Sequence, residues 1–326
     1  MRKTMGKAWV VAGVAAAVVV HRIEQYRAVD ADARSAGLLV PRVRRNAQVL
    51  TEALRPTPTG PRPGWAGDGV RTENIEQHTQ ARYHTPEREP GDTAVLWFHG
   101  GGLVMGTPDS NDNVCRQLAR DLGVPVLAAG YRLAGQAPFP AALDDAVGWH
   151  DYLVTQGFRR IIVGGTSAGG GIAAALAQLL VDAGRPPAFQ ILIHPMLDDR
   201  TQLRPTPGRG VFAWNKLNNH VGWSAYLRSR PGRGAKPRYA VPARRDNYEG
   251  LPPAFISVGS QDLFFDEDVR YANSLIDAGV WARLHVVVGG IHGDIMEHWA
   301  SAPYQQLWRS LLGALAEHGV VQEKLR

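Results

Sequence analysis

The sequence predicts an α/β fold with a mostly parallel sheet and helices on both faces of that sheet. Short apolar segments alternate with segments long enough for three or four helical turns from residue 94 onward. Several short segments are apolar at every position, as is typical of parallel strands that helices cover on both sides. A stretch of about fifty residues, 199–250, interrupts the alternation, so we expect it to form a lid or cap insertion.

The expected strands and helices follow one another in order along the chain. Each helix is followed by a glycine that can form a C-terminal cap, namely Gly123, Gly157, Gly184 and Gly279. We expect strands over residues 94–98, 124–129, 161–163, 190–194, 254–258 and 283–288, and helices over residues 111–122, 141–156, 168–183 and 266–278.

The chain is expected to divide into three parts. Residues 1–70 form an N-terminal apolar helix, a cap segment and a linker that is rich in proline and glycine from residue 55. Residues 71–198 and 251–326 form the core, and residues 199–250 form a basic lid.

The N-terminus combines a basic start with an apolar stretch over residues 8–20. This pattern resembles an export signal, but no cleavage site lies at a suitable distance. A helix that lies on or anchors to a membrane, and a helix that packs on the protein, are the other interpretations. The sequence therefore indicates a cytoplasmic or membrane-associated protein, with export through an N-terminal signal as an alternative.

Composition excludes several classes of protein. With 44% hydrophobic and 20% charged residues in 326, the chain can bury a large core and is not intrinsically disordered. No apolar run reaches the roughly 18–20 residues that cross a bilayer, which excludes a polytopic membrane protein. The single cysteine, Cys115, excludes an internal disulfide framework and cysteine-rich metal sites.

Positive charge is concentrated in the expected lid. Residues 200–245 contain eleven Lys and Arg and no Asp or Glu, whereas the net charge of the whole chain is only +6. A basic patch together with an apolar N-terminus is a combination that attaches proteins to anionic lipid, so we expect peripheral association with an anionic membrane. Nucleic-acid binding is disfavoured because no recognised binding module accompanies the charge.

Ser167 is the expected nucleophile. The segment Gly165-Thr166-Ser167-Ala168-Gly169 lies directly between an expected strand and an expected helix. A Gly-x-Ser-x-Gly sequence in that position forms a strained turn that raises the serine hydroxyl above the sheet, and only small neighbours leave room for it. A glycine-rich structural turn and a phosphate-binding loop are the alternatives.

A second glycine-rich segment, His99-Gly100-Gly101-Gly102, follows the first expected strand. Acyl transfer generates an oxyanion, which preorganised backbone N–H groups stabilise. We expect the donors of this oxyanion hole to be Gly101, Gly102 and Ala168, and we expect His99 to order the loop. A tight turn without a catalytic role is the alternative.

Asp262 and His292 are the expected acid and base. Each follows a strand, so both lie on loops at the carboxyl edge of the sheet together with Ser167, in the chain order serine, acid, histidine. Asp266 and Glu267 are rivals for the acid, but they begin a helix and are expected to serve its N-terminus.

Three other histidines are expected to be structural. His285 lies within a strand and His298 within an expected helix. His194 is expected to be buried near the sheet edge, where it precedes Pro195 and has no carboxylate in the required chain order.

Taken together, these segments resemble the hormone-sensitive-lipase family of bacterial esterases, the fold-3 group of α/β hydrolases. Thr166 before the serine resembles the branch of that family with the sequence Gly-Thr-Ser-Ala-Gly. The resemblance covers about residues 70–300. The matching segments are residues 99–102, 131–134, 139–145, 165–170, 251–253, 262–267 and 290–293.

The resemblance implies an α/β-hydrolase fold, a Ser167–Asp262–His292 triad, and no metal or cofactor. It also implies a helical cap that the N-terminal segment and the insertion build together. The implied activity is that of a serine carboxylesterase, which hydrolyses short- to medium-chain carboxylic esters of small molecules through an acyl-enzyme. An amidase or lactonase with the same triad is an alternative, and so is a ligand-binding relative without activity.

The sequence departs from the family pattern at four positions. Gly135 and Gln136 replace a Pro-Glu pair, which is expected to remove a buried carboxylate. Leu263 replaces the proline that usually follows the acid. Asp294 replaces the phenylalanine that usually follows the glycine after the histidine, which leaves the polarity of the pocket and the acyl preference open.

Overall fold

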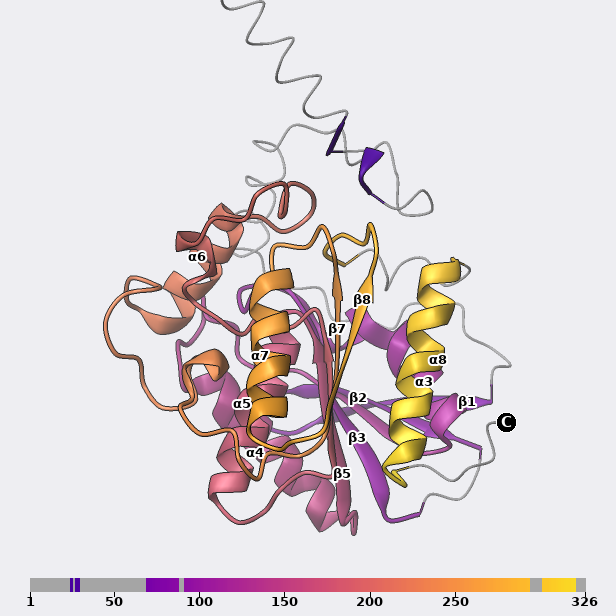
Figure 1. Ribbon diagram of the computed structural model, residues 1–326. Helices are drawn as coiled ribbons and strands as arrows, with labels where there is room; N and C mark the ends of the chain where they lie inside the picture. Colours follow the sequence, from indigo (N-terminus) through magenta and orange to yellow (C-terminus); the bar gives the residue numbers. More distant parts are fainter. Residues whose placement is uncertain (1–23, 26, 30–68, 88–90, 294–300, 321–326) are drawn as a thin grey trace, which may run out of the picture.

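An eight-stranded sheet forms the centre of the protein (Figure 1). The computed structural model describes residues 24, 25, 27–29, 69–87, 91–293 and 301–320. The strands lie in the order β1-β2-β4-β3-β5-β6-β7-β8. The β1–β2 and β2–β4 pairs are antiparallel, and the other five pairs are parallel. The strands are β1 (Val70–Glu76), β2 (Gln80–Pro86), β3 (Thr93–Phe98), β4 (Val126–Ala129), β5 (Arg160–Thr166), β6 (Phe189–Ile193), β7 (Ala254–Gly259) and β8 (Ala282–Val287).

Helices cover both faces of the sheet. α4 (Ala141–Thr155), α5 (Ala168–Asp182) and α7 (Phe265–Asp277) lie on one face, and α3 (Asp112–Leu122) and α8 (Ala302–Glu317) lie on the other (Figure 1). Each face has its own cluster of buried apolar side chains between the sheet and the helices. The expected α/β fold with a mostly parallel sheet is therefore confirmed.

All six expected strands and all four expected helices are present, with ends that differ by a few residues. The four glycines expected as helix caps adopt the left-handed conformation, in which glycine has no steric penalty. Their φ angles are 64° at Gly123, 92° at Gly157, 70° at Gly184 and 75° at Gly279.

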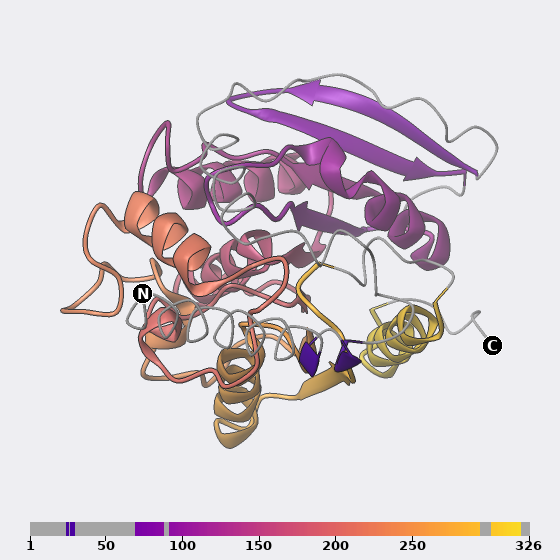
Figure 2. The same ribbon diagram turned by 90° about the horizontal axis from the view of Figure 1, so that it is seen from above.

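Three elements were not expected from the sequence. The β1–β2 hairpin forms one edge of the molecule, with β8 at the opposite edge of the sheet (Figure 2). In β1 only Val70 is buried, so this strand lacks the apolar pattern by which the inner strands were predicted. The third element is α8, which covers the sheet next to β8.

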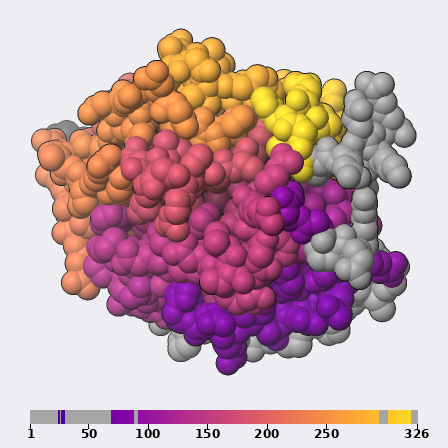
Figure 3. Space-filling view, turned by 90° about the horizontal axis from the view of Figure 1, so that it is seen from below, coloured from indigo at the N-terminus to yellow at the C-terminus, as the bar shows by residue number. Residues whose placement is uncertain are grey.

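The insertion over residues 199–250 contains one helix, α6 (Lys216–Leu227), and two short 3-10 turns, Thr201–Leu203 and Pro242–Arg244. A further 3-10 turn, Pro108–Asn111, precedes α3. Figure 1 shows α6 beyond the end of the sheet at which β7 and β8 finish. Residues of the insertion, coloured orange, are also visible from below beside the core (Figure 3). The insertion thus extends from the carboxyl edge of the sheet along one side of the core.

The apolar helix expected over residues 8–20 and the linker up to residue 68 lie outside the described residues. Within the described ranges, no helix is both long enough and apolar enough to cross a membrane.

Candidate active site

Ser167 occupies the turn between β5 and α5. β5 ends at Thr166 and α5 begins at Ala168, so this one residue makes the connection. Its φ of 53° lies in the left-handed region, which a serine adopts only when the surroundings hold it there. The N–H of Ser167 donates to the carbonyl of Ile193 at 2.9 Å, which ties the turn to the neighbouring strand.

The glycines on either side of Ser167 allow the turn to approach the end of β3. A Cβ atom at Gly165 would lie 2.6 Å from the carbonyl oxygen of Phe98, and a Cβ atom at Gly169 would overlap the same oxygen. Neither position can therefore accept a side chain, which explains why this strand-to-helix turn has glycine at both places.

Ser167, His292 and Asp262 form a hydrogen-bonded series. The Oγ of Ser167 lies 2.9 Å from Nε2 of His292, and Nδ1 of His292 lies 2.8 Å from Oδ2 of Asp262. Asp262 is on the loop between β7 and α7, and His292 is on the loop that follows β8. The structure thus brings together three residues that the sequence placed on separate loops at one edge of the sheet.

The electrostatics of Asp262 favour the carboxylate. Burial alone would raise the pKa of Asp262, but the charge of His292 and its hydrogen bond outweigh that effect and hold the pKa below its usual value. The N–H of Phe264 also donates to Oδ1 of Asp262 at 2.9 Å. Asp262 accepts a hydrogen bond from the Nδ1–H of His292, so Nε2 is the ring atom that faces the Ser167 hydroxyl.

Three rings surround the imidazole of His292. The ring centroids of His194, Phe264 and Trp214 lie 4.6, 5.0 and 6.3 Å from it. His194 is buried, as expected, and burial lowers its pKa to about 3, so it presents a neutral ring to His292. Sequence reasoning missed the contacts of His194 and Trp214 with His292, because their segments are far apart in the chain.

The residues expected to form the oxyanion hole lie beside Ser167, the expected nucleophile. A Cβ atom at Gly100 would lie 3.4 Å from Cβ of Ser167, so the glycine-rich loop touches the turn that carries the serine. Gly101 and Gly102 have φ angles of 120° and 60°, which favour glycine. In the described part of the chain, no protein acceptor takes the N–H of Gly101, Gly102 or Ala168.

His99 holds this loop in place. Its Nδ1 donates to the carbonyl of Gly100 at 2.7 Å, and its ring stacks on Tyr131 with the centroids 4.4 Å apart. The hydroxyl of Tyr131 in turn donates to the carbonyl of His99 at 2.9 Å. Burial lowers the pKa of His99 to about 4, so the ring is neutral at pH 7. These contacts are those expected of a residue that orders the loop.

The rival acids lie where they were expected. Asp266 and Glu267 are in the first turn of α7, where acidic residues favour the helix dipole, and neither takes the place of Asp262 beside His292. Asp266 also accepts a 2.7 Å hydrogen bond from Arg209. Glu267 is buried and accepts from the N–H of Leu197 at 2.7 Å and from the hydroxyl of Thr201. Both carboxylates therefore lie at the N-terminal end of α7 and also bind other segments of the chain.

Gln136, which stands where the family usually has a carboxylate, is exposed, and its side-chain oxygen accepts from the N–H of Leu133 at 3.2 Å. His285 lies in β8, as expected. Asp294 and His298 lie outside the described residues.

The sequence is similar to an α/β-hydrolase family and to proteins named as ester hydrolases. The profile of the α/β-hydrolase fold family matches residues 95–296. Esterase LipI of Mycobacterium tuberculosis is 37% identical over 214 residues, which cover 62% of this chain and 65% of LipI, just under two thirds of that protein. Ethyl acetate hydrolase of Pseudomonas putida is 34% identical over 231 residues, which cover 66% of this chain and 72% of the hydrolase.

Solved structures show the same similarity over more of the chain. A bacterial heroin esterase superposes with a TM-score of 0.75 and 29% identity, over 90% of this chain and 98% of that one. An esterase from the bacterial hormone-sensitive lipase family superposes with a TM-score of 0.67 and 25% identity, over 83% of this chain and 96% of that one.

Proposed function

The chain belongs to the α/β-hydrolase family whose profile covers residues 95–296, and from this premise we propose that it is a serine carboxylesterase. The observation that carries the proposal is the hydrogen-bonded series Ser167–His292–Asp262 beside the backbone donors of Gly101 and Ala168. Two similar proteins, an esterase and an ethyl acetate hydrolase, support carboxylic esters of small molecules as the substrate class.

Acylation begins with attack by Ser167 Oγ on the ester carbonyl carbon. His292 Nε2 takes the hydroxyl proton as the bond forms, and Asp262 stabilises the resulting imidazolium. The N–H groups of Gly101, Gly102 and Ala168 donate to the oxyanion of the tetrahedral intermediate. When the intermediate collapses, His292 returns the proton to the departing alcohol, and the acyl group stays on Ser167.

Deacylation repeats the sequence with water. His292 Nε2 removes a proton from a water molecule, and the hydroxide attacks the acyl carbon. The same backbone donors hold the second oxyanion. Collapse restores the Ser167 hydroxyl with the proton from His292 and releases the carboxylic acid. No step requires a metal or a cofactor.

A graded series of p-nitrophenyl esters from acetate to palmitate, with a matching anilide and a lactone, tests the proposal. We expect the highest kcat/KM on short- to medium-chain esters. Turnover of only the anilide or the lactone would reassign the protein as an amidase or lactonase. Binding without turnover of any compound would indicate a ligand-binding relative.

Membrane association remains a second proposal, together with a cap made from residues 1–70 and 199–250. The structure reduces the charge available for it, because six of the eleven basic residues of the lid pair with aspartates. The pairs are Arg200 and Arg204 with Asp198, Arg244 with Asp199, Arg238 and Arg245 with Asp182, and Arg209 with Asp266. The attachment we propose therefore relies on the N-terminal segment and on the exposed Arg228, Arg230 and Arg233.

Flotation with liposomes tests this attachment. We expect binding to vesicles that contain anionic lipid, release by salt, and weaker binding after deletion of residues 1–22 or after replacement of Arg228, Arg230 and Arg233 by Gln. Arg238→Gln is the matched control, because the exposed Arg238 already pairs with Asp182. Equal recovery with neutral and anionic vesicles, or no recovery with either, would contradict the proposal.

A further inference from the structure

The lid contacts the glycine-rich loop of residues 99–102, which we call the oxyanion loop, at Gly102. Trp214 of the lid covers the α-carbon of Gly102 so closely that a Cβ atom there would overlap the indole ring. Gly222 of α6 also lies against Gly102, because a Cβ atom on Gly222 would overlap the carbonyl oxygen of Gly102. Trp214, Gly222 and Gly102 are all buried.

Gly102 depends on these contacts more than its neighbours do. Within the loop, the carbonyl of Gly101 accepts from the N–H groups of Val104 and Met105, both at 3.1 Å, and the carbonyl of Leu103 accepts from Ala134 at 2.8 Å. Among the described residues, no hydrogen bond joins Gly102 to the rest of the protein. Its left-handed backbone is therefore held by its neighbours in the chain and by van der Waals contact with the lid.

The lid can supply a rigid support because α6 is itself anchored. The side chain of Asn215 caps the helix by accepting from the N–H groups of Leu217 and Asn218 at 2.9 and 3.1 Å. Towards its other end, the carbonyl of Tyr226 accepts from the N–H of Phe139 at 2.8 Å, which joins the helix to the core. The two ends of α6 are thus fixed on either side of Gly222.

We propose that Trp214 and Gly222 are positioning residues that aim the N–H of Gly102 at the oxyanion of the reacting ester. The inference rests on the proposed esterase function and deepens it, because it makes the lid a part of transition-state stabilisation and not only a cover. Loss of a whole oxyanion donor typically costs about 10²–10³-fold in kcat, so misplacement of one donor should cost about 10-fold to 100-fold.

Gly222→Ala tests the proposal, with Gly313→Ala as the matched control. Both glycines lie inside helices, but a Cβ atom at Gly313 meets only the end of the Arg283 side chain, at 3.6 Å. We expect kcat for p-nitrophenyl acetate to fall about 10-fold to 100-fold in Gly222→Ala, with KM within about 3-fold of wild type, and Gly313→Ala to behave as wild type.

The inhibition constant of a trifluoromethyl ketone distinguishes positioning of the oxyanion donor from a role of Trp214 and Gly222 in stability alone. It adds to the serine as a hemiketal whose oxyanion occupies the hole, so its inhibition constant should rise in parallel with the loss of kcat/KM. Trp214→Ala removes the contact with Gly102 without adding atoms, and it should show the same loss of kcat and of affinity for the ketone. Trp214→Phe should restore part of both.

The outcomes separate this inference from the function on which it rests. A wild type that hydrolyses no ester and is not labelled by a fluorophosphonate overturns the proposed function and this inference with it. An active wild type whose Gly222→Ala and Trp214→Ala variants keep their kcat and their affinity for the ketone overturns the inference alone. If Gly222→Ala does not fold, the comparison of Trp214→Ala with Trp214→Phe decides in the same way.

Discussion

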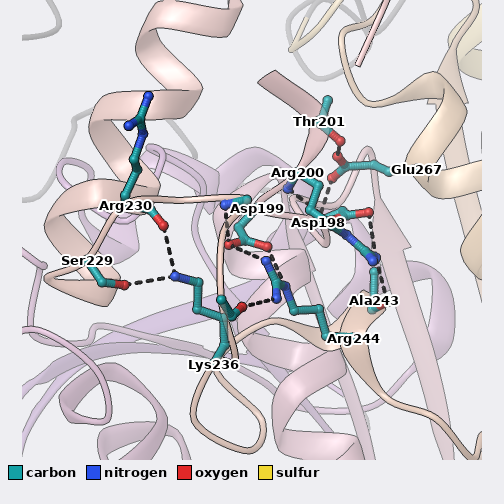
Figure 4. A network of polar contacts seen from close by, with 12 residues as sticks. Asp198, Asp199, Arg200, Thr201, Ser229, Arg230, Lys236, Ala243, Arg244 and Glu267 are labelled. Atoms are coloured by element: carbon teal, nitrogen blue, oxygen red, sulfur yellow. Dashed lines mark hydrogen bonds and ion pairs between the residues drawn. The ribbon is translucent and has the colours of Figure 1, made fainter. Parts of the chain in front are cut away.

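Charged side chains form two networks, the triad and the network around Asp199 at the base of the lid. The triad leads to the Ser167 hydroxyl, whereas the Asp199 network joins parts of the fold to one another. In the triad, Asp262 serves one imidazole and one backbone N–H, and the imidazole then faces the hydroxyl of Ser167. At the base of the lid, Asp199 is fully buried and accepts from Arg244 at 2.7 and 3.0 Å and from the N–H of Gly232 at 2.7 Å (Figure 4). The first network ends at the Ser167 hydroxyl, which is proposed to react with substrate. The second network consists of charged and backbone groups that bind one another.

This difference shows what a run of basic residues in a sequence can mean. The lid has eleven basic residues and no acid between residues 200 and 245, yet most of its arginines pair with aspartates at its boundary or in the core. Those pairs hold the lid to the core and leave little charge for an outside partner.

The largest effect is expected from the reactive end of the triad. Ser167→Ala and His292→Ala should each lower kcat for p-nitrophenyl acetate by about 10⁴-fold or more, because residues that act as a unit fail together. The double variant should be no worse than either single one. Steady-state kinetics on folded protein measures this, and a double variant that loses the product of the two single effects would contradict a triad.

The next prediction separates the two acids that follow β7. Asp262→Asn should lower kcat by about 10³–10⁴-fold, because His292 loses the partner that fixes its tautomer and stabilises its charge. Asp266→Asn should leave kcat within about 2-fold and change stability by at most about 1 kcal/mol, because Asp266 forms a half-exposed ion pair with Arg209. If Asp266→Asn lowered kcat more than Asp262→Asn did, the assignment of Asp262 as the triad acid would be wrong.

In the lid, the expected effect is on stability instead of turnover. Asp199→Ala leaves Arg244 without its buried partner and should lower the free energy of unfolding by about 3 kcal/mol. Arg238→Ala is the contrast, because the side chain of Arg238 is 71% exposed where it meets Asp182, and its loss should cost at most about 1 kcal/mol. Chemical denaturation followed by tryptophan fluorescence measures both, and equal losses would contradict the distinction.

The smallest effect concerns a carboxyl group that belongs to neither network. Asp268 is fully buried, and among the described residues neither of its carboxyl oxygens has a hydrogen-bond partner. Burial, with Glu267 and Asp262 nearby, raises the pKa of Asp268 well above 3.8. The folded state therefore keeps a proton that the unfolded state releases, and stability is lost as the pH rises from about 4 toward the folded pKa.

Asp268→Asn removes this pH dependence. The variant should gain stability relative to wild type as the pH rises from about 5 to about 8, because it has no carboxyl group that must stay protonated in the folded state. Denaturation curves at the two pH values measure the gain. The same difference between variant and wild type at both values would show that Asp268 does not titrate with folding.

The inner sheet and the triad were predictable because their signals are local. Strands apolar on both faces, a glycine after each helix and a Gly-x-Ser-x-Gly turn each depend on a few adjacent residues. The β1–β2 hairpin was not predicted, because most of β1 is exposed and lacks an apolar pattern. α8 was readable in part, since Tyr304, Leu307, Leu311 and Leu315 follow helical spacing, but Gly313 weakens the pattern.

Contacts between distant segments were not predictable in the same way. Nothing near Trp214 in the sequence indicates that its ring covers Gly102, and nothing near Arg245 indicates a partner at Asp182. Glu267 lies at its own helix end, as expected, but its hydrogen bonds to the segment that leads into the lid were not predictable. Such pairings depend on the packing of whole elements, which short patterns do not encode.

The most direct test of the central claim is to trap the acyl-enzyme. Wild-type protein mixed rapidly with p-nitrophenyl acetate and quenched in acid should gain one acetyl group, and peptide mapping by mass spectrometry should locate it on Ser167. Ser167→Ala should gain none, and Asp266→Asn should behave as wild type. An acetyl group on another residue, or ester turnover without any acetyl-protein in either wild type or Asp266→Asn, would contradict the assignment of Ser167 as the nucleophile.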